Sequence, residues 1–302
     1  MKDRTRRFVA SVILALTLLG TNLLMPLLTQ MPNVFASADW LNGWNYRRKL
    51  TINSTLIDAD LTNFPVLVKL DSSFFNFSKA RDNGEDVRFT GSDGVTLSKY
   101  EIERWDKTAG KAEAWVKIPS VSNASDTDFF IYYGNPSAQS IQDPTNVWDS
   151  NFKMVQHLKE TSGTHEDSTT NNNDGSPQGG VTQGTTGKID GADSFDGVND
   201  YVNCGTQTSL TVTSMTIEAW VKRRGNGDTA NTGTGGFIGE PIVAKGRAHN
   251  ETIGWNVNYF LAIRQSDVRV GFDFEDNING ANHPIFSTSS VANNQWYNTV
   301  IT

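Results

Sequence analysis

Acidic and amide side chains in the C-terminal half of the chain carry the oxygen ligands that a calcium site needs. Asp196, Asn199 and Asp200 lie within five residues in SFDGVNDYVNCG, and Asp167 and Asp174 lie in the loop region before them. Calcium takes six to eight oxygen ligands, so the first three residues are too few by themselves. The sequence therefore predicts calcium as a cofactor only if these carboxylates converge from separate loops.

The same stretch also has the composition of a structural turn. Asp196-Gly197 and Asn199-Asp200 are strong turn formers between strand-like runs. A β-hairpin with this turn needs no metal, so a metal loop and a plain turn both remain open. Neither TTNNNDG nor EDNING is an EF-hand loop, because neither has glutamate at the twelfth position.

Motifs that carry catalysis are absent from the sequence. The four histidines form no H-E-x-x-H pair, no G-x-S-x-G elbow occurs, and GTTGKI lacks residues that a phosphate loop requires. Glu101 and Glu103 would lie about 6.5–7 Å apart on one face of a strand, a spacing that permits a glycosidase pair. Any E-x-E strand gives that spacing. We interpret the pair as a solvent-facing strand surface and predict that the protein is not an enzyme.

Aromatic residues give a different signal, because many of them fall in or near strand-like runs. A ring on a sheet can stack on the apolar face of a sugar while polar neighbours bind the sugar hydroxyls. Trp255, Tyr259 and Trp296 are the candidates for such a ligand-binding surface. The alternative for each of them is packing in a core.

The elements that must position these residues are strands. Short β-rich runs recur at roughly ten-residue spacing between clusters of Gly, Asn, Asp, Ser and Pro, and helical periodicity is almost absent. The fold class predicted is all-β, with two antiparallel β-sandwich, jelly-roll-like domains in tandem at residues 39–147 and 148–302. Because WYNTVIT stops within an apparent strand, we expect the second domain to be incomplete at its C-terminus.

Residues 1–38 have the layout of a secretory signal peptide. A basic start is followed by an apolar run from Phe8 to Leu28 and by the small residues of an A-x-A-like site. The alternative is a retained membrane anchor, since the run is long enough to span a bilayer. We expect cleavage and a secreted protein, located outside the cell, on its surface or on the periplasmic side, with no membrane insertion after cleavage.

The charge of the mature chain limits its partners. Without residues 1–38 the chain has 22 basic against 32 acidic residues, a net charge of −10. Nucleic acid is therefore not expected as a partner, because phosphate binding needs clustered cations. Cys204 is the only cysteine, so no disulfide forms within one chain.

Two family resemblances follow from longer motifs. GWNYRRKLTI, FPVLVKL, GEDVRFTGSDGVTLSKYEIERWD and FFIYYGNPSA lie in order between Trp40 and about Asp149, and this segment resembles domain of unknown function 2341. GKIDGADSFDGVNDYV, MTIEAWVK and NQWYNTVIT resemble the concanavalin A-like, laminin-G-like jelly roll. The first resemblance implies a sandwich without a known activity. The second implies binding of carbohydrate or extracellular proteins, often with calcium.

The function expected is therefore non-catalytic binding or adhesion at the cell surface, with a polysaccharide or an extracellular protein as partner. The alternative is a structural or accessory module. The larger protein would then be a surface protein, an enzyme or a transporter-energising membrane protein whose activity lies beyond Thr302.

Overall fold

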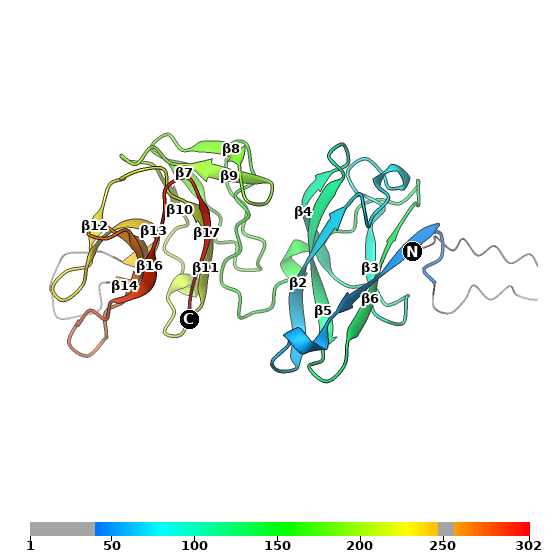
Figure 1. Ribbon diagram of the computed structural model, residues 1–302, viewed down its shortest axis with the longest axis horizontal. Helices are drawn as coiled ribbons and strands as arrows, with labels where there is room; N and C mark the ends of the chain where they lie inside the picture. Colours follow the sequence, from blue (N-terminus) through cyan, green and yellow to red (C-terminus); the bar gives the residue numbers. More distant parts are fainter. Residues whose placement is uncertain (1–39, 247–256) are drawn as a thin grey trace, which may run out of the picture. The chain divides into compact units, whose positions relative to one another are not determined.

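The computed structural model describes residues 40–246 and 257–302, and these residues form antiparallel strands joined by turns (Figure 1). The signal peptide predicted at residues 1–38 lies outside the described part. Short 3₁₀-helices interrupt the loops at η1 Ser54–Leu56, η2 Phe77–Lys79, η3 Pro144–Asn146 and η4 Thr208–Leu210. Among the described residues, no helix is long and apolar enough to cross a membrane. The all-β fold class expected from the sequence is confirmed.

Strands β1–β6 form the N-terminal sandwich, in which one sheet has the order β1-β6-β3 and the other the order β2-β5-β4. Their bounds are β1 Tyr46–Ile52, β2 Leu61–Asp71, β3 Arg88–Thr90, β4 Tyr100–Asp106, β5 Lys111–Val121 and β6 Thr127–Tyr133. Pro65 lies in β2, which is an edge strand where a missing N–H is tolerated. Alternation along the central strand β5 directs Ala112, Ala114 and Val116 inward.

One continuous core holds the two sheets of this sandwich together. Phe89 and Ile131 from one sheet meet Tyr100 and Val116 from the other, and all four are at most 1% exposed. Fully burying a large apolar side chain of this kind stabilises the fold by about 1.5–3 kcal/mol. The loops at the rim of the sandwich are therefore attached to a rigid scaffold.

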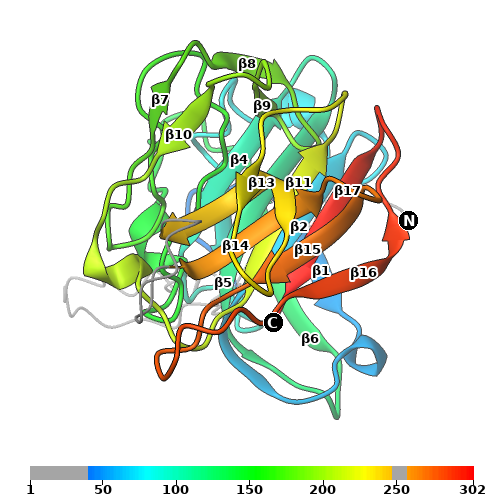
Figure 2. The same ribbon diagram turned by 90° about the vertical axis from the view of Figure 1, so that its left-hand side faces the viewer.

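The C-terminal strands form several smaller ladders. Their bounds are β7 Ser176–Gln178, β8 Thr182–Thr186, β9 Gly191–Ser194, β10 Tyr201–Asn203, β11 Ile217–Lys222, β12 Ala230–Asn231, β13 Ile238–Gly246, β14 Val257–Arg264, β15 Arg269–Asp273, β16 Ile285–Ser290 and β17 Trp296–Ile301. Figure 2 shows β13, β14 and β15 side by side in the five-stranded sheet β12-β13-β14-β15-β16. The remaining pairs are β10-β7, β8-β9 and β11-β17.

Strand β14 is buried on both faces. Phe260 and Ala262 belong to one apolar cluster, and Tyr259 and Leu261 belong to another. Successive side chains of a strand point to opposite faces, so the five-stranded sheet is covered on both sides at this strand. The second cluster includes residues of β11 and β17, which places the inner face of that strand pair against β14.

Candidate functional site

The pair β11–β17 has one core face and one outer face. Ile217 and Ile301 are direct partners in the ladder, and both pack against the cluster that contains Tyr259. Because side chains alternate along each strand, Trp220 of β11 and Trp296 of β17 lie on the opposite face. We call this outer surface the tryptophan face, and it consists of Glu218, Trp220, Lys222, Trp296, Asn298 and Val300.

The two tryptophans occupy diagonal positions on this face. Trp220 lies opposite Asn298 in the ladder and Trp296 lies opposite Lys222, so the tryptophans are diagonal partners. Diagonal positions of an antiparallel pair are about 7–8 Å apart, within reach of aromatic side chains. Trp220 is 43% exposed, which makes it accessible to a ligand as well as to its neighbours.

Charged and amide groups surround the rings. Lys188 Nζ lies 4.8 Å from the centre of the Trp220 ring, and Lys222 Nζ lies 5.3 Å from the centre of the Trp296 ring. These are cation–π distances, so each ammonium group is attracted to the face of its indole ring. Asn298 Nδ2 donates a hydrogen bond of 2.8 Å to Glu218 Oε1 on the same face.

The three aromatic residues predicted to bind a ligand do not lie on one common surface. Trp296 lies on the tryptophan face, whereas Tyr259 is 7% exposed and packs in the core. Trp255 lies outside the described residues. Trp220 was not among the predicted site residues, although the charged residues near it in the sequence indicate an exposed strand face. Glu218 and Lys222 lie two residues to either side of it, and charged side chains at these positions favour a solvent-facing surface.

Asp167 and Asp174 lie in one loop, and their oxygens bind the chain itself. Asp167 is 5% exposed and its carboxylate accepts hydrogen bonds from Val155 N, Thr169 N, Thr169 Oγ1 and Asn173 N, all of 2.8–3.0 Å. The Asp167 amide in turn donates to Asp174 Oδ1 at 2.9 Å. Both oxygens of the Asp167 carboxylate are thus occupied by loop contacts.

Asp196 and Asp200 lie in a second turn and close it from both sides. Asp196 Oδ1 accepts from Val198 N at 2.8 Å, and Asp200 Oδ2 accepts from the Asp196 amide at 2.8 Å. Gly197 takes a φ of +79°, a conformation that favours glycine. Across residues 40–246 and 257–302, no three His, Cys, Asp or Glu side chains form a group that could hold a metal ion. Calcium binding stays a prediction.

The expectation of a solvent-facing surface for Glu101 and Glu103 is wrong, because their side chains are only 3% and 8% exposed. His157 lies between them, with Nε2 3.1 Å from Glu101 Oε1 and Nδ1 3.5 Å from Glu103 Oε2. Glu101 also accepts hydrogen bonds from Trp148 Nε1 at 2.7 Å and Ser168 Oγ at 2.8 Å. We call these residues the His157 clasp, which attaches the segment at 148–168 to strand β4.

The clasp shifts the proton affinities of its members. Burial opposes a charge on His157, but its hydrogen bonds and coulombic attraction to Glu101 and Glu103 outweigh this and raise its pKa to about 9. Burial raises the pKa of Glu101, yet the contacts with His157, Ser168 and Trp148 leave that pKa below its ordinary value. His157 and Glu101 are therefore both ionised at neutral pH. This buried ion pair attaches the segment at 148–168 to strand β4.

A second histidine repeats this arrangement a few residues later. His165 is fully buried, with Nδ1 2.8 Å from Glu160 Oε2 and Nε2 2.8 Å from Asp193 Oδ2. Burial raises the pKa of Asp193. The sequence offered no sign of either arrangement. Glu101 and Glu103 come from β4, far from His157 in the chain, and Asp193 comes from β9, although Glu160 lies only five residues before His165.

One family model matches part of the chain. Residues 83–173 match the model of a domain of unknown function, DUF2341. This match supports the first of the two resemblances found in the sequence. It ends past Asp149 and includes both sides of the His157 clasp. No curated protein and no solved structure matches the chain. The resemblance of the C-terminal residues to a jelly-roll family remains a prediction.

Proposed function

We propose that the chain is a secreted or cell-surface binding protein without catalytic activity, which recognises a polysaccharide through the tryptophan face. The observation that carries this proposal is the pairing of Trp220 and Trp296 on the outer face of β11–β17. Single exposed aromatic residues are normal on soluble proteins, but apolar side chains that share one face and are rimmed by polar residues often mark a binding site. Two tryptophans at diagonal positions on one face of a strand pair can each stack on a sugar unit of the same polysaccharide chain.

The polar groups of the face favour a sugar over an apolar partner. Glu218 and Asn298 present acceptors and donors beside the rings, and Lys188 and Lys222 add further donors. A sugar ring combines an apolar face with a rim of hydroxyls, so it can use both kinds of contact at once. An extracellular protein is the other partner class expected from the sequence, and the experiment below separates the two.

The test is binding of the 302-residue chain to an array of neutral polysaccharides, with calcium and with a chelator. We expect saturable binding that weakens about tenfold in Trp220→Ala or Trp296→Ala, because loss of one stacked ring costs about 1 kcal/mol or more. Tyr201→Ala is the matched control, since Tyr201 is an aromatic residue 55% exposed on β10.

Three results would decide against this function. Absence of binding to every polysaccharide in both buffers would remove carbohydrate as the partner and leave an extracellular protein or an accessory role. If both tryptophan variants bound as tightly as the unmodified chain, the site would lie elsewhere. A loss of binding in Tyr201→Ala as large as in Trp220→Ala would indicate a non-specific effect of removing surface aromatics.

A further inference from the structure

A groove in the N-terminal sandwich has features of a second binding site. A cleft of ≈ 520 Å³ lies between Arg48 of β1, the segment 72–78 after β2 and the β4–β5 turn at 107–110. A cleft of ≈ 460 Å³ adjoins it and is lined by Asp82 and the segment 105–108. The two clefts share Lys107 and Thr108 and so adjoin at the β4–β5 turn; we call the pair the groove, and its smaller part also presents Asp82 and Asp106. Each cleft has the volume of a typical small-molecule site.

The larger cleft carries positive charge without a carboxylate in its lining. Arg48 and Lys107 both line it, and no aspartate or glutamate does. The Arg48 guanidinium lies 5.3 Å from the centre of the Phe74 ring, and no hydrogen bond or ion pair ties it to another described residue. Its N–H donors therefore have no protein acceptor among the described residues and are available to an anionic group.

Lys107 is held at the boundary between the two clefts. Its Nζ donates hydrogen bonds of 2.8 Å to Ala80 O and to Asp82 Oδ1, which leaves one N–H for a ligand. Phe74 supplies a partly buried aromatic surface in the larger cleft, and Ser72, Ser78 and Thr108 line it with hydroxyl groups. The lining therefore combines an aromatic surface, hydroxyls and two cations.

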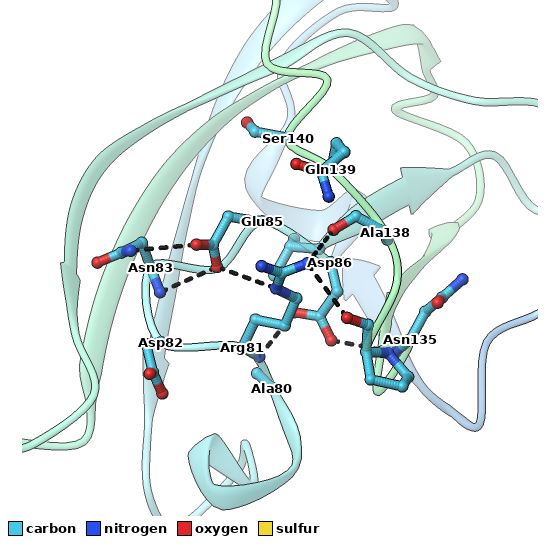
Figure 3. Close-up of polar contacts among 12 residues, drawn as sticks. Ala80, Arg81, Asp82, Asn83, Glu85, Asp86, Asn135, Ala138, Gln139 and Ser140 are labelled. Carbon is cyan, nitrogen blue, oxygen red and sulfur yellow. Dashed lines mark hydrogen bonds and ion pairs between the residues drawn. The ribbon is translucent and has the colours of Figure 1, made fainter.

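The loop that carries Asp82 is fixed before any ligand arrives. Figure 3 shows Arg81 reaching across to Ala138, whose carbonyl accepts from Arg81 Nη1 at 2.7 Å. The buried Asp86 carboxylate accepts from the Arg81 amide at 2.9 Å. Gly84, at a φ of +70°, lies so close to Trp105 that an added Cβ would be 2.9 Å from the indole. A fixed loop of this kind lowers the entropy cost of binding.

From this geometry we infer that the groove binds an acidic sugar chain, with the anionic group on Arg48 and the sugar ring against Phe74. A neutral sugar would leave the guanidinium in the cleft uncompensated, whereas a carboxylate or sulfate ester matches its paired N–H donors. The hydroxyls and Lys107 would then bind the rest of the ring. This site lies on other strands than the tryptophan face, and its existence does not depend on that face.

Titration calorimetry of the 302-residue chain with oligogalacturonate tests this inference, with its methyl ester as the uncharged analogue. We expect binding to the acid, binding at least tenfold weaker to the ester, and weakening of the former as salt is raised. Arg48→Gln should weaken binding of the acid about 10- to 100-fold, as expected for a lost hydrogen-bonded charge pair. Dextran sulfate in a parallel titration distinguishes a sulfate ester from a carboxylate as the preferred anion.

Lys49→Gln is the matched control for charge. Lys49 is the next residue on β1, it does not line the groove, and its Nζ pairs with Asp128 at 3.0 Å. This variant should bind as the unmodified chain does, and so should Trp220→Ala. Equal affinity for the acid and its ester, or binding unchanged in Arg48→Gln, would overturn the inference. Equally tight, Arg48-dependent binding of hexaglutamate would overturn a sugar site in favour of an acidic peptide.

Discussion

The loop at Asp167–Asp174 and the turn at Asp196–Asp200 look alike in sequence and differ in structure. Each combines acidic residues with asparagine, glycine lies within the turn and directly after the loop at Gly175, and each supplied two of the four carboxylates predicted for a calcium site. In the first, Asp167 is buried and accepts four hydrogen bonds. In the second, Asp196 is exposed and accepts one short hydrogen bond, from Val198 N.

The difference lies in what surrounds each carboxylate. The first loop lies beside the His157 clasp, where Ser168, the residue after Asp167, donates to Glu101. A carboxylate removed from water must be compensated by donors, so Asp167 organises the backbone around itself. In the second turn Asp196 remains in contact with water and needs no such compensation, whereas Asp200 is partly buried and its Oδ1 has no hydrogen-bond partner. Similar sequence patterns therefore serve a buried attachment in one place and a surface turn in the other.

The largest expected effect is from removal of the buried carboxylate. Asp167→Ala leaves the donors of Val155, Thr169 and Asn173 without their acceptor in a buried loop. We expect a loss of about 3–5 kcal/mol in the free energy of unfolding, since each unsatisfied buried group costs about 1–3 kcal/mol. Urea unfolding measures the loss, and amide hydrogen exchange of residues 153–175 localises it.

Asp174→Ala is the control for this prediction. Asp174 is exposed, and its carboxylate accepts one backbone hydrogen bond, from Asp167 N. Its loss should cost about 1 kcal/mol. Equal destabilisation by the two variants would mean that burial does not decide how much a carboxylate contributes to the stability of this loop.

The next effect is a pH dependence from the His157 clasp. The pKa of His157 is raised in the folded chain from 6.5 to about 9. Protonated His157 therefore makes its full contribution to the free energy of unfolding below pH 6.5, and this contribution is lost as pH rises through about 9. The loss is on the order of 2–3 kcal/mol. Glu101, whose pKa is lowered, adds stability above its ordinary pKa of 4.5 that is lost as pH falls further.

Urea unfolding between pH 6 and 9.5 measures this dependence, with His157→Gln as the reference variant. The variant should be less stable at pH 6 and should have a flatter profile across that range. An identical slope in both proteins would show that another group titrates. Loss of protection at residues 148–168, measured by hydrogen exchange at high pH, would assign the effect to the attached segment.

Parts of this structure followed from the sequence because they depend on local patterns. Alternation and turn residues predicted the strands, and the charged neighbours of Trp220 at Glu218 and Lys222 contained the information for the outer face. The burial of Glu101 and Glu103 could not be predicted in the same way. An E-x-E strand is solvent-facing unless another segment covers it, and the cover comes from His157, more than fifty residues later. Tyr259 shows the same limit, since its burial depends on strands on both sides of β14.

The smallest expected effect is at the exposed turn, where Asp196→Ala combined with Asp200→Ala tests the remaining metal interpretation. The double variant removes the side-chain contacts to Val198 N and Asp196 N, both at partly or fully exposed residues. We expect a loss of about 1 kcal/mol or less, because solvent replaces those contacts. The loss should be the same in calcium and in chelator. If calcium raised the melting temperature of the unmodified chain but not that of the double variant, Asp196 and Asp200 would be calcium ligands. The turn would then have a metal-binding function that the buried Asp167 carboxylate does not have.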